Sequence, residues 1–128
     1  MLREVIFIPN RNRYERIIKS HILYMEAQGA YVDIYLINKD KHRISTNLQQ
    51  FIEQISDDYF FKVSRKHIIN INQITAFQNN KVWFDEKEII VTKTYKLALE
   101  SKLPIIRTKF QNEKIDSQEE IDISEEIG

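Results

Sequence analysis

Short segments with the two-residue period of β-strands, separated by polar turns, dominate this chain. The clearest is Tyr31–Ile37 (YVDIYLI), in which the apolar residues Val32, Ile34 and Leu36 alternate with polar or aromatic ones. Such alternation predicts a strand with one buried face and one polar face. Six Tyr and seven Phe residues also favour strands over helices. The chain is therefore expected to be mostly β.

Further strands are predicted on both sides of this segment. Residues 11–16 are expected to form a turn, and Gly29 is expected to adopt a positive φ in the hairpin loop Ala27–Ala30. The predicted strands are Val5–Ile8, Ile17–Lys19, Ile22–Glu26, His42–Ser45, Phe60–Val63, His67–Asn70, Ile74–Phe77, Lys81–Phe84 and Ile89–Thr92.

Two short helices are predicted where the apolar period lengthens. Within residues 48–55 the apolar side chains recur at spacings of three and four, the pattern of an amphipathic helix. Ser45, Thr46 or Asn47 can cap its N-terminus, because each has a side-chain oxygen for the free backbone amides. A second helix is predicted over Thr94–Lys102, before Pro104.

A basic segment lies between two of the predicted strands. Phe60–Asn70 (FFKVSRKHIIN) presents Lys62, Ser64, Arg65 and Lys66 together at a turn. A hydroxyl group and basic side chains on a rigid support can hold phosphate and read guanine edges. The alternative is a solvated turn that only connects two strands.

The neutral overall charge conceals an uneven distribution. Residues 1–110 contain 18 of the 19 cationic residues and 12 of the 19 anionic residues, a net charge of +6. Residues 111–128 are acidic and polar, and we expect them to form a disordered tail. A basic domain favours polyanionic partners through the release of counterions.

Several other classes of protein are disfavoured. There is no cysteine, no apolar run of the ~20 residues that a membrane span needs, and no glycine-rich phosphate loop. The three histidines lack the spacing of metal ligands. We therefore expect a cytoplasmic protein without catalytic residues, metal or cofactor.

Four segments in order carry a resemblance to a known family: ILYMEAQGAYVDIYL, ISTNLQQFIEQI, YFFKVSRKHIININQI and IIVTKTYKLAL. Together they resemble the LytTR DNA-binding domain family, which comprises bacterial transcription regulators of the AlgR, AgrA and LytR type. The resemblance runs from about Ile17 to Leu103.

The resemblance implies about ten short strands in stacked antiparallel sheets, an elongated sandwich with one or two short helices. It also implies binding to double-stranded DNA through loops at one sheet edge that enter successive major grooves. Operators with repeated half-sites would then hold two copies of the domain side by side. The DNA-binding positions that it implies here are Gln28, Gly29, Tyr31, Lys62, Ser64, Arg65, Lys66, Lys93, Thr94 and Lys96.

Each of these positions has a chemical role and an alternative. Arg65 is suited to grip guanine O6 and N7, or it pairs with Asp57 or Asp58. The four lysines are suited to phosphate contacts, or they are solvated. Gln28 is suited to pair with adenine, or it is a turn residue. Ser64 and Thr94 donate to phosphate or cap the local backbone.

Two motifs depart from the family pattern. Ser64-Arg65-Lys66 stands where the family usually has His-Arg-Ser, and Thr92–Tyr95 stands where Ser-Arg-Arg-Tyr is common. Lysine lacks the bidentate fork of arginine, so base specificity is weakened. A second hypothesis is therefore a non-catalytic protein-interaction or regulatory module that kept the fold, with the acidic tail as an autoinhibitory segment.

The expected organisation has three parts. Residues 1–16 form an N-terminal strand and basic segment, residues 17–110 form the LytTR-like domain, and residues 111–128 form the acidic tail. Many regulators of this family carry a receiver domain, for which this chain has no room. We therefore expect a stand-alone member or a domain cut from a longer regulator.

Overall fold

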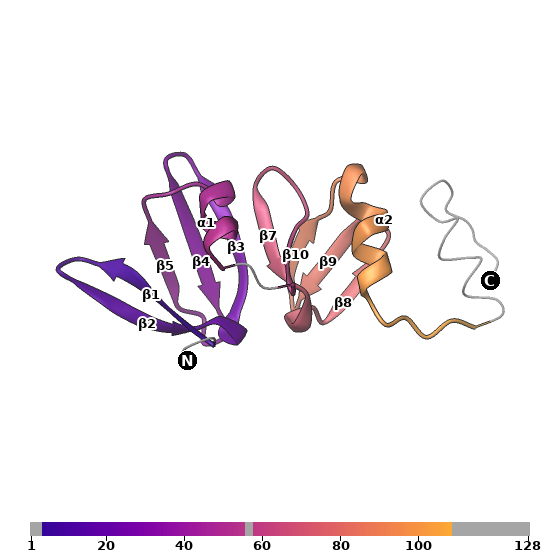
Figure 1. Ribbon diagram of the computed structural model, residues 1–128. Helices are drawn as coiled ribbons and strands as arrows, with labels where there is room; N and C mark the ends of the chain where they lie inside the picture. The colour runs from indigo at the N-terminus through magenta and orange to yellow at the C-terminus, as the bar shows by residue number, and fades with distance from the viewer. Residues whose placement is uncertain (1–3, 56–57, 109–128) are drawn as a thin grey trace. The chain divides into compact units, whose positions relative to one another are not determined.

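The β-rich pattern folds into two units in a computed structural model that describes residues 4–55 and 58–108. The first unit ends at Ile74 and the second begins at Thr75. The described residues form ten strands in three antiparallel sheets and two α-helices (Figure 1). The expected mostly β fold with about ten short strands and two short helices is therefore confirmed.

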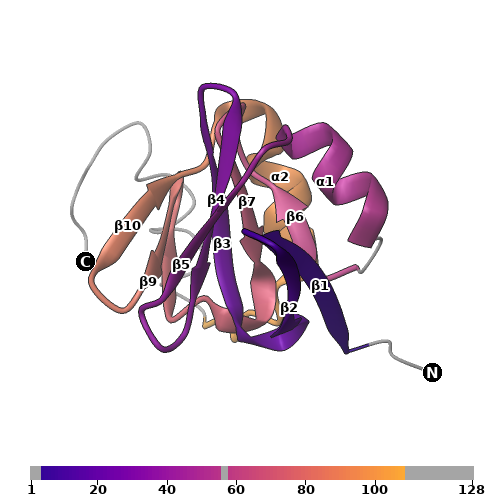
Figure 2. The same ribbon diagram turned by 90° about the vertical axis from the view of Figure 1, so that its left-hand side faces the viewer.

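The first unit contains a two-stranded hairpin and a five-stranded sheet. The hairpin pairs β1 (Val5–Asn10) with β2 (Arg13–Ile18). Figure 2 shows the two strands of this hairpin side by side. The larger sheet has the order β5-β4-β3-β7-β6, and Figure 1 shows β4 between β3 and β5. Its strands are β3 (Ile22–Gln28), β4 (Tyr31–Leu36), β5 (Lys41–Ile44), β6 (Phe60–Lys62) and β7 (His67–Asn70).

The two faces of the larger sheet differ because side chains alternate along each strand. On one face, Met25, Val32, Ile34 and Ile68 are fully buried in a hydrophobic cluster that also includes Ile17 of the hairpin. Removing such a side chain from water contributes about 1.5–3 kcal/mol. The other face carries polar and aromatic side chains. This face includes the groups that surround the candidate site.

Helix α1 (Leu48–Ile55) confirms the predicted amphipathic helix. Leu48, Phe51 and Ile55 are buried against the first unit's core. Of the three capping residues proposed from the sequence, Asn47 provides the bond, because its Oδ1 accepts the backbone N–H of Gln50 at 2.8 Å.

The second unit contains a three-stranded sheet and helix α2. The sheet has the order β10-β9-β8, formed by β8 (Ala76–Gln78), β9 (Lys81–Phe84) and β10 (Lys87–Ile90). Helix α2 (Lys93–Lys102) confirms the second predicted helix. The strand expected at residues 89–92 begins and ends two residues earlier, because Lys87 pairs with Phe84 directly across a tight turn.

The structure corrects two expected element boundaries, one in the first unit and one at the start of the second. The turn expected at residues 11–16 is reduced to Arg11 and Asn12, because Arg13–Ile18 pairs with the whole length of β1. The strand expected at Ile74–Phe77 starts only at Ala76. It is preceded by a 3₁₀ turn (η2, Ile71–Gln73), which Asn70 caps through its side chain.

The remaining expectations about organisation stay predictions. Residues 111–128, the expected acidic tail, lie outside the described residues. The expected divisions at residues 16 and 110 are likewise not tested by the fold. No helix in the described part of the chain is long and apolar enough to cross a bilayer.

Candidate nucleic-acid interface

Two of the sequence-predicted loops lie side by side at one end of the five-stranded sheet. Strands β3 and β4 are joined by a two-residue turn, with Gln28 paired to Tyr31. Strand β7 pairs with β3 so that His67 faces Glu26. Beyond this pair the backbone N–H of Ala27 donates to the carbonyl of Lys66 at 2.8 Å. The structure therefore brings the residue 28–31 loop next to the residue 62–66 segment.

The basic turn between β6 and β7 is closed by its own hydrogen bonds. The backbone N–H of Val63 donates to the carbonyl of His67 at 3.0 Å. The Oγ atom of Ser64 accepts the backbone N–H groups of Lys66 at 3.2 Å and of His67 at 3.1 Å. Of the two roles considered for Ser64, capping of the local backbone is therefore present in the structure. It also holds the turn in one conformation.

Arg65 and Lys66 are the exposed cationic residues at the tip of this turn. The alternative pairing of Arg65 with Asp58 is not formed among the described residues, where Arg65 makes no ion pair. Asp57, the other proposed partner, lies outside the described residues. Lys62 is half-buried at the end of β6. Among the described residues, the guanidinium group of Arg65 is therefore exposed and makes no ion pair.

The neighbouring loop has the predicted backbone at Gly29. This residue adopts a φ of 60°, and a Cβ added there would meet no atom within 4 Å. Glycine is favoured because the conformation, rather than the available space, excludes other residues. Gln28 is half-buried, whereas Tyr31 is 45% exposed.

Arg43 and Asp33 support this loop, and the sequence analysis did not identify either. The guanidinium of Arg43 lies 5.5 Å from the centre of the Tyr31 ring, a cation–π distance. Two nitrogens of this guanidinium also donate to the carboxylate of Asp33, Nε to Oδ1 at 2.8 Å and Nη2 to Oδ2 at 3.0 Å. Asp33 is only 1% exposed, so this bidentate pair satisfies a buried carboxylate. Asp33 and Arg43 are opposite each other on β4 and β5, so recognising this pair in the sequence would have required the register of the two strands.

The hydrogen bonds from Arg43 determine the ionisation of Asp33. They lower the pKa of its carboxyl group below the ordinary value of 3.8, and burial opposes this only in part. Lys41 adds a weaker attraction at 3.9 Å from Oδ2. Asp33 therefore remains ionised throughout the neutral range.

Glu26 and His67 form a second polar pair on the same sheet face. His67 Nε2 lies 3.4 Å from Glu26 Oε2, and the Tyr35 hydroxyl donates to Glu26 Oε1 at 3.3 Å. The rings of Tyr24 and Tyr35 stack with their centres 4.5 Å apart, and the His67 ring lies 6.1 Å from that of Tyr24. Glu26 was interpreted from the sequence as structural, through the loop or a neighbouring cation, and its pairing with His67 agrees with that interpretation.

The remaining sequence-predicted residues belong to the second unit. Lys93, Thr94 and Lys96 lie in the first turn of α2, where Lys93 and Thr94 are exposed and Lys96 is half-buried. Lys93 and Lys96 are three residues apart and share one helix face.

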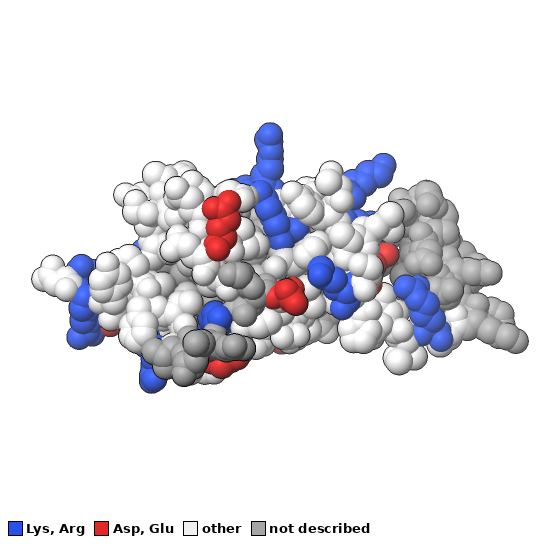
Figure 3. All heavy atoms as spheres, viewed as in Figure 1, with Lys and Arg blue, Asp and Glu red and all other residues white. Residues whose placement is uncertain are grey.

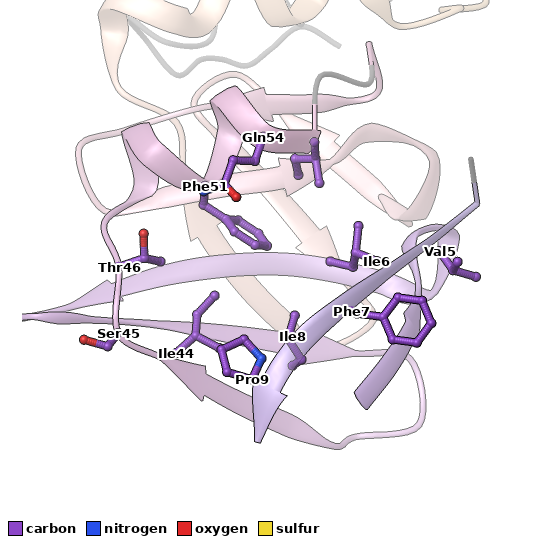
Figure 4. A pocket seen from close by; sticks show the side chains of 11 residues that line it. Val5, Ile6, Phe7, Ile8, Pro9, Ile44, Ser45, Thr46, Phe51 and Gln54 are labelled. Carbon is purple, nitrogen blue, oxygen red and sulfur yellow. The ribbon is translucent and has the colours of Figure 1, made fainter. Parts of the chain in front are cut away.

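Other basic and hollow regions lack the predicted site residues. Figure 3 shows Lys and Arg side chains scattered over the visible face among acidic and uncharged residues. In the hairpin, Arg13 is paired with Glu15 at 2.8 Å. A groove of about 490 Å³ lies between β1 and α1, and Figure 4 shows Ile6 and Phe51 on its opposite sides. In the part of the chain that the structure describes, no charged side chain lines this groove. Among the described residues no group of three acidic or histidine side chains is placed to hold a metal ion.

The comparisons with known proteins agree with this geometry. The family model of the LytTr DNA-binding domain matches residues 10–104. A solved LytTr DNA-binding domain from Bacillus cereus superposes with a TM-score of 0.65 at 18% sequence identity. The superposition covers 80% of this chain and 98% of that domain. No curated protein matches the chain. The family match spans most of the sequence, and the chain therefore belongs to the LytTR family of DNA-binding domains.

Proposed function

We propose that this chain is a sequence-specific regulator of transcription that binds double-stranded DNA through loops at one sheet edge. The observation that carries the proposal is the hydrogen bond from Ala27 to Lys66, which joins the residue 28–31 loop to the basic turn. Loops held on a rigid sheet can enter successive major grooves without a recognition helix. Membership of a DNA-binding family supports the same function.

The polar groups of the two loops and of α2 have two expected roles, base recognition and phosphate contact. Arg65 presents a free guanidinium fork suited to guanine O6 and N7, and Gln28 presents an amide suited to adenine. Lys62, Lys66, Lys93 and Lys96 are suited to phosphate oxygens, which position the protein but carry little sequence information. Ser64 and Thr94 add hydroxyl donors.

The direct test is selection of bound duplexes from a random pool at moderate salt. A regulator of this kind enriches a motif with repeated half-sites, each occupied by one copy of the domain. Absence of any enriched motif would instead support the second hypothesis, a protein-interaction module that kept the fold.

Two variants distinguish recognition of bases from contact with phosphates. Arg65→Lys keeps the charge but removes the bidentate fork, so preference for the selected motif should fall by about 1–3 kcal/mol while binding to random DNA is retained. Lys93→Ala should weaken both classes of DNA alike. Lys87→Ala, another exposed lysine of the second unit, is the matched control. Equal loss on both DNA classes in Arg65→Lys would contradict the assignment of Arg65.

A further inference from the structure

A half-buried polar pair lies directly beside the basic turn. Glu26 and His67 are cross-strand partners on β3 and β7, and each side chain is 17% exposed. The Glu26 carboxylate faces a donor on each side: His67 Nε2 at 3.4 Å and the Tyr35 hydroxyl at 3.3 Å. His67 is also the residue at which the turn ends and β7 begins. Any change in its protonation therefore occurs beside the turn itself.

The hydrogen bonds of Ser64 couple the turn to the His67 ring. Its Oγ accepts two backbone N–H groups, from Lys66 and His67, which use both of its lone pairs. The hydroxyl hydrogen is left to donate, and His67 Nδ1 lies 3.4 Å from Oγ. In this arrangement Nδ1 is an acceptor and Nε2–H points to Glu26, which is a neutral imidazole tautomer.

Protonation of the ring changes the direction of the hydroxyl group. A proton on Nδ1 removes the acceptor of the Ser64 hydroxyl, so this hydrogen turns away from the ring. The Ser64 hydroxyl is then free to donate a hydrogen bond to a phosphate oxygen of DNA bound beside Arg65 and Lys66. The charged ring also strengthens its pairing with Glu26 and adds a positive charge behind the turn.

The other groups facing His67 do not titrate near neutral pH. Burial raises the pKa of Tyr24 to about 12 and also raises the pKa of Tyr35, so both phenols are neutral there. Asp33, beside Glu26 on the same face, is held ionised by Arg43 and Lys41. Among the side-chain types of this set, histidine is the one whose ordinary pKa, about 6.5, lies near the neutral range.

We propose that Glu26 and His67 are positioning residues of the DNA-binding turn, and that the turn with protonated His67 binds phosphate more tightly than the turn with neutral His67. This inference rests on the proposed function. Bound DNA then favours the protonated ring. The gain in affinity is therefore full at low pH and is lost as the pH rises through the titration of His67 in the complex.

The first experiment measures DNA affinity of the whole chain at constant ionic strength. We expect binding at pH ~6 to be about tenfold tighter than at pH ~8, the change for a one-unit difference in proton affinity between free and bound states. In His67→Phe this pH dependence should disappear, whereas it should persist in the exposed control His21→Phe. Equal pH profiles for wild type and a folded His67→Phe would overturn the inference.

A permanently charged substitution provides a rescue. His67→Lys keeps a cation opposite Glu26, so it should bind DNA at pH ~8 about as tightly as wild type does at pH ~6. Loss of affinity at both pH values, in a variant that melts at the wild-type temperature, would count against the role of the charge.

The second experiment uses the protein without DNA, and its first readout needs only the wild type. In an NMR titration, the backbone amide signals of Lys66 and His67 should shift with the same midpoint as the His67 ring. The Glu26→Gln variant should lower that midpoint, whereas Glu53→Gln, an exposed α1 residue, should leave it unchanged.

The two levels of the proposal can fail separately. Amide signals that do not follow the His67 ring overturn the positioning role, whatever the DNA result. Wild-type protein that binds no DNA at any pH overturns the proposed function, while the NMR result still decides whether the ring controls the turn.

Discussion

At the residue scale, Asn70 shows how a single buried amide connects the end of β7 to the start of β3. It is fully buried at the end of β7. Its Nδ2 donates to the carbonyl of Ile22 at 2.8 Å, and its Oδ1 accepts the backbone N–H of Asn72 at 2.9 Å. Because a buried polar group without a partner is costly, both backbone groups depend on this one side chain.

We expect Asn70→Ala to lower the free energy of unfolding by about 1–3 kcal/mol, since it leaves the Ile22 carbonyl and the Asn72 amide without their bonds. Urea denaturation measures this change. Asn72→Ala is the matched control, and because that side chain is exposed its effect should stay within about 0.5 kcal/mol. Similar losses for the two variants would contradict the role of Asn70.

Asp33 belongs to the same scale and predicts a pH dependence of stability. Its pKa is lowered in the folded state by the hydrogen bonds from Arg43, so the unfolded chain binds the proton more readily. The stabilisation is therefore complete above the ordinary carboxyl value and is lost as the pH falls through the lowered one.

We expect wild-type protein to lose more unfolding free energy than Asp33→Asn between about pH 6 and about pH 3. Denaturation curves at the two pH values give the difference. The exposed Asp58→Asn variant should follow the wild type. An Asp33→Asn variant with the full wild-type acid sensitivity would show that Arg43 does not hold this carboxylate.

At the scale of elements, α1 illustrates how one cap specifies a helix start. The helix has only eight residues, so its isolated stability is marginal and its packing and capping decide whether it forms. Leu48, Phe51 and Ile55 supply the packing, and Asn47 supplies the cap.

We expect Asn47→Ala to destabilise the protein by about 1 kcal/mol, because the Gln50 amide loses its acceptor. Asn47→Asp should remain close to wild type, since its carboxylate accepts the same bond at the positive end of the helix. Thermal melts of both variants test this prediction. A large loss in both would show that the position is needed for another reason.

At the scale of the whole molecule, charge determines how strongly DNA binding responds to salt. Residues 1–110 carry a net charge of +6, and both units contain cationic residues. Phosphate contacts release counterions, so affinity should fall steeply as salt is added.

If about five phosphates are neutralised, the logarithm of the binding constant should fall with the logarithm of the salt concentration with a slope of about −4.5. Filter binding or fluorescence anisotropy over a range of salt gives this slope. Lys66→Ala should make it shallower by about one. A slope near zero would exclude binding through the phosphate backbone.

Local patterns predicted much of this molecule. The alternation in residues 31–37, the helical period in residues 48–55 and the glycine at position 29 each depend on a few neighbouring residues, and each was confirmed. Only the end of strand β2 was predicted, as part of the strand expected at Ile17–Lys19, because RYERII has no clear alternation. Its extended form depends on pairing with β1, which lies outside any local window.

The sequence by itself determined the β-rich class, the order of its elements and the basic, hydroxyl-bearing turn, because these follow from local period and composition. Only the tertiary structure placed Ala27 against Lys66, Glu26 against His67 and Asp33 against Arg43. The reason is strand register. A slip of one residue turns every side chain to the opposite face, and register is set by contacts between segments that are distant in the chain.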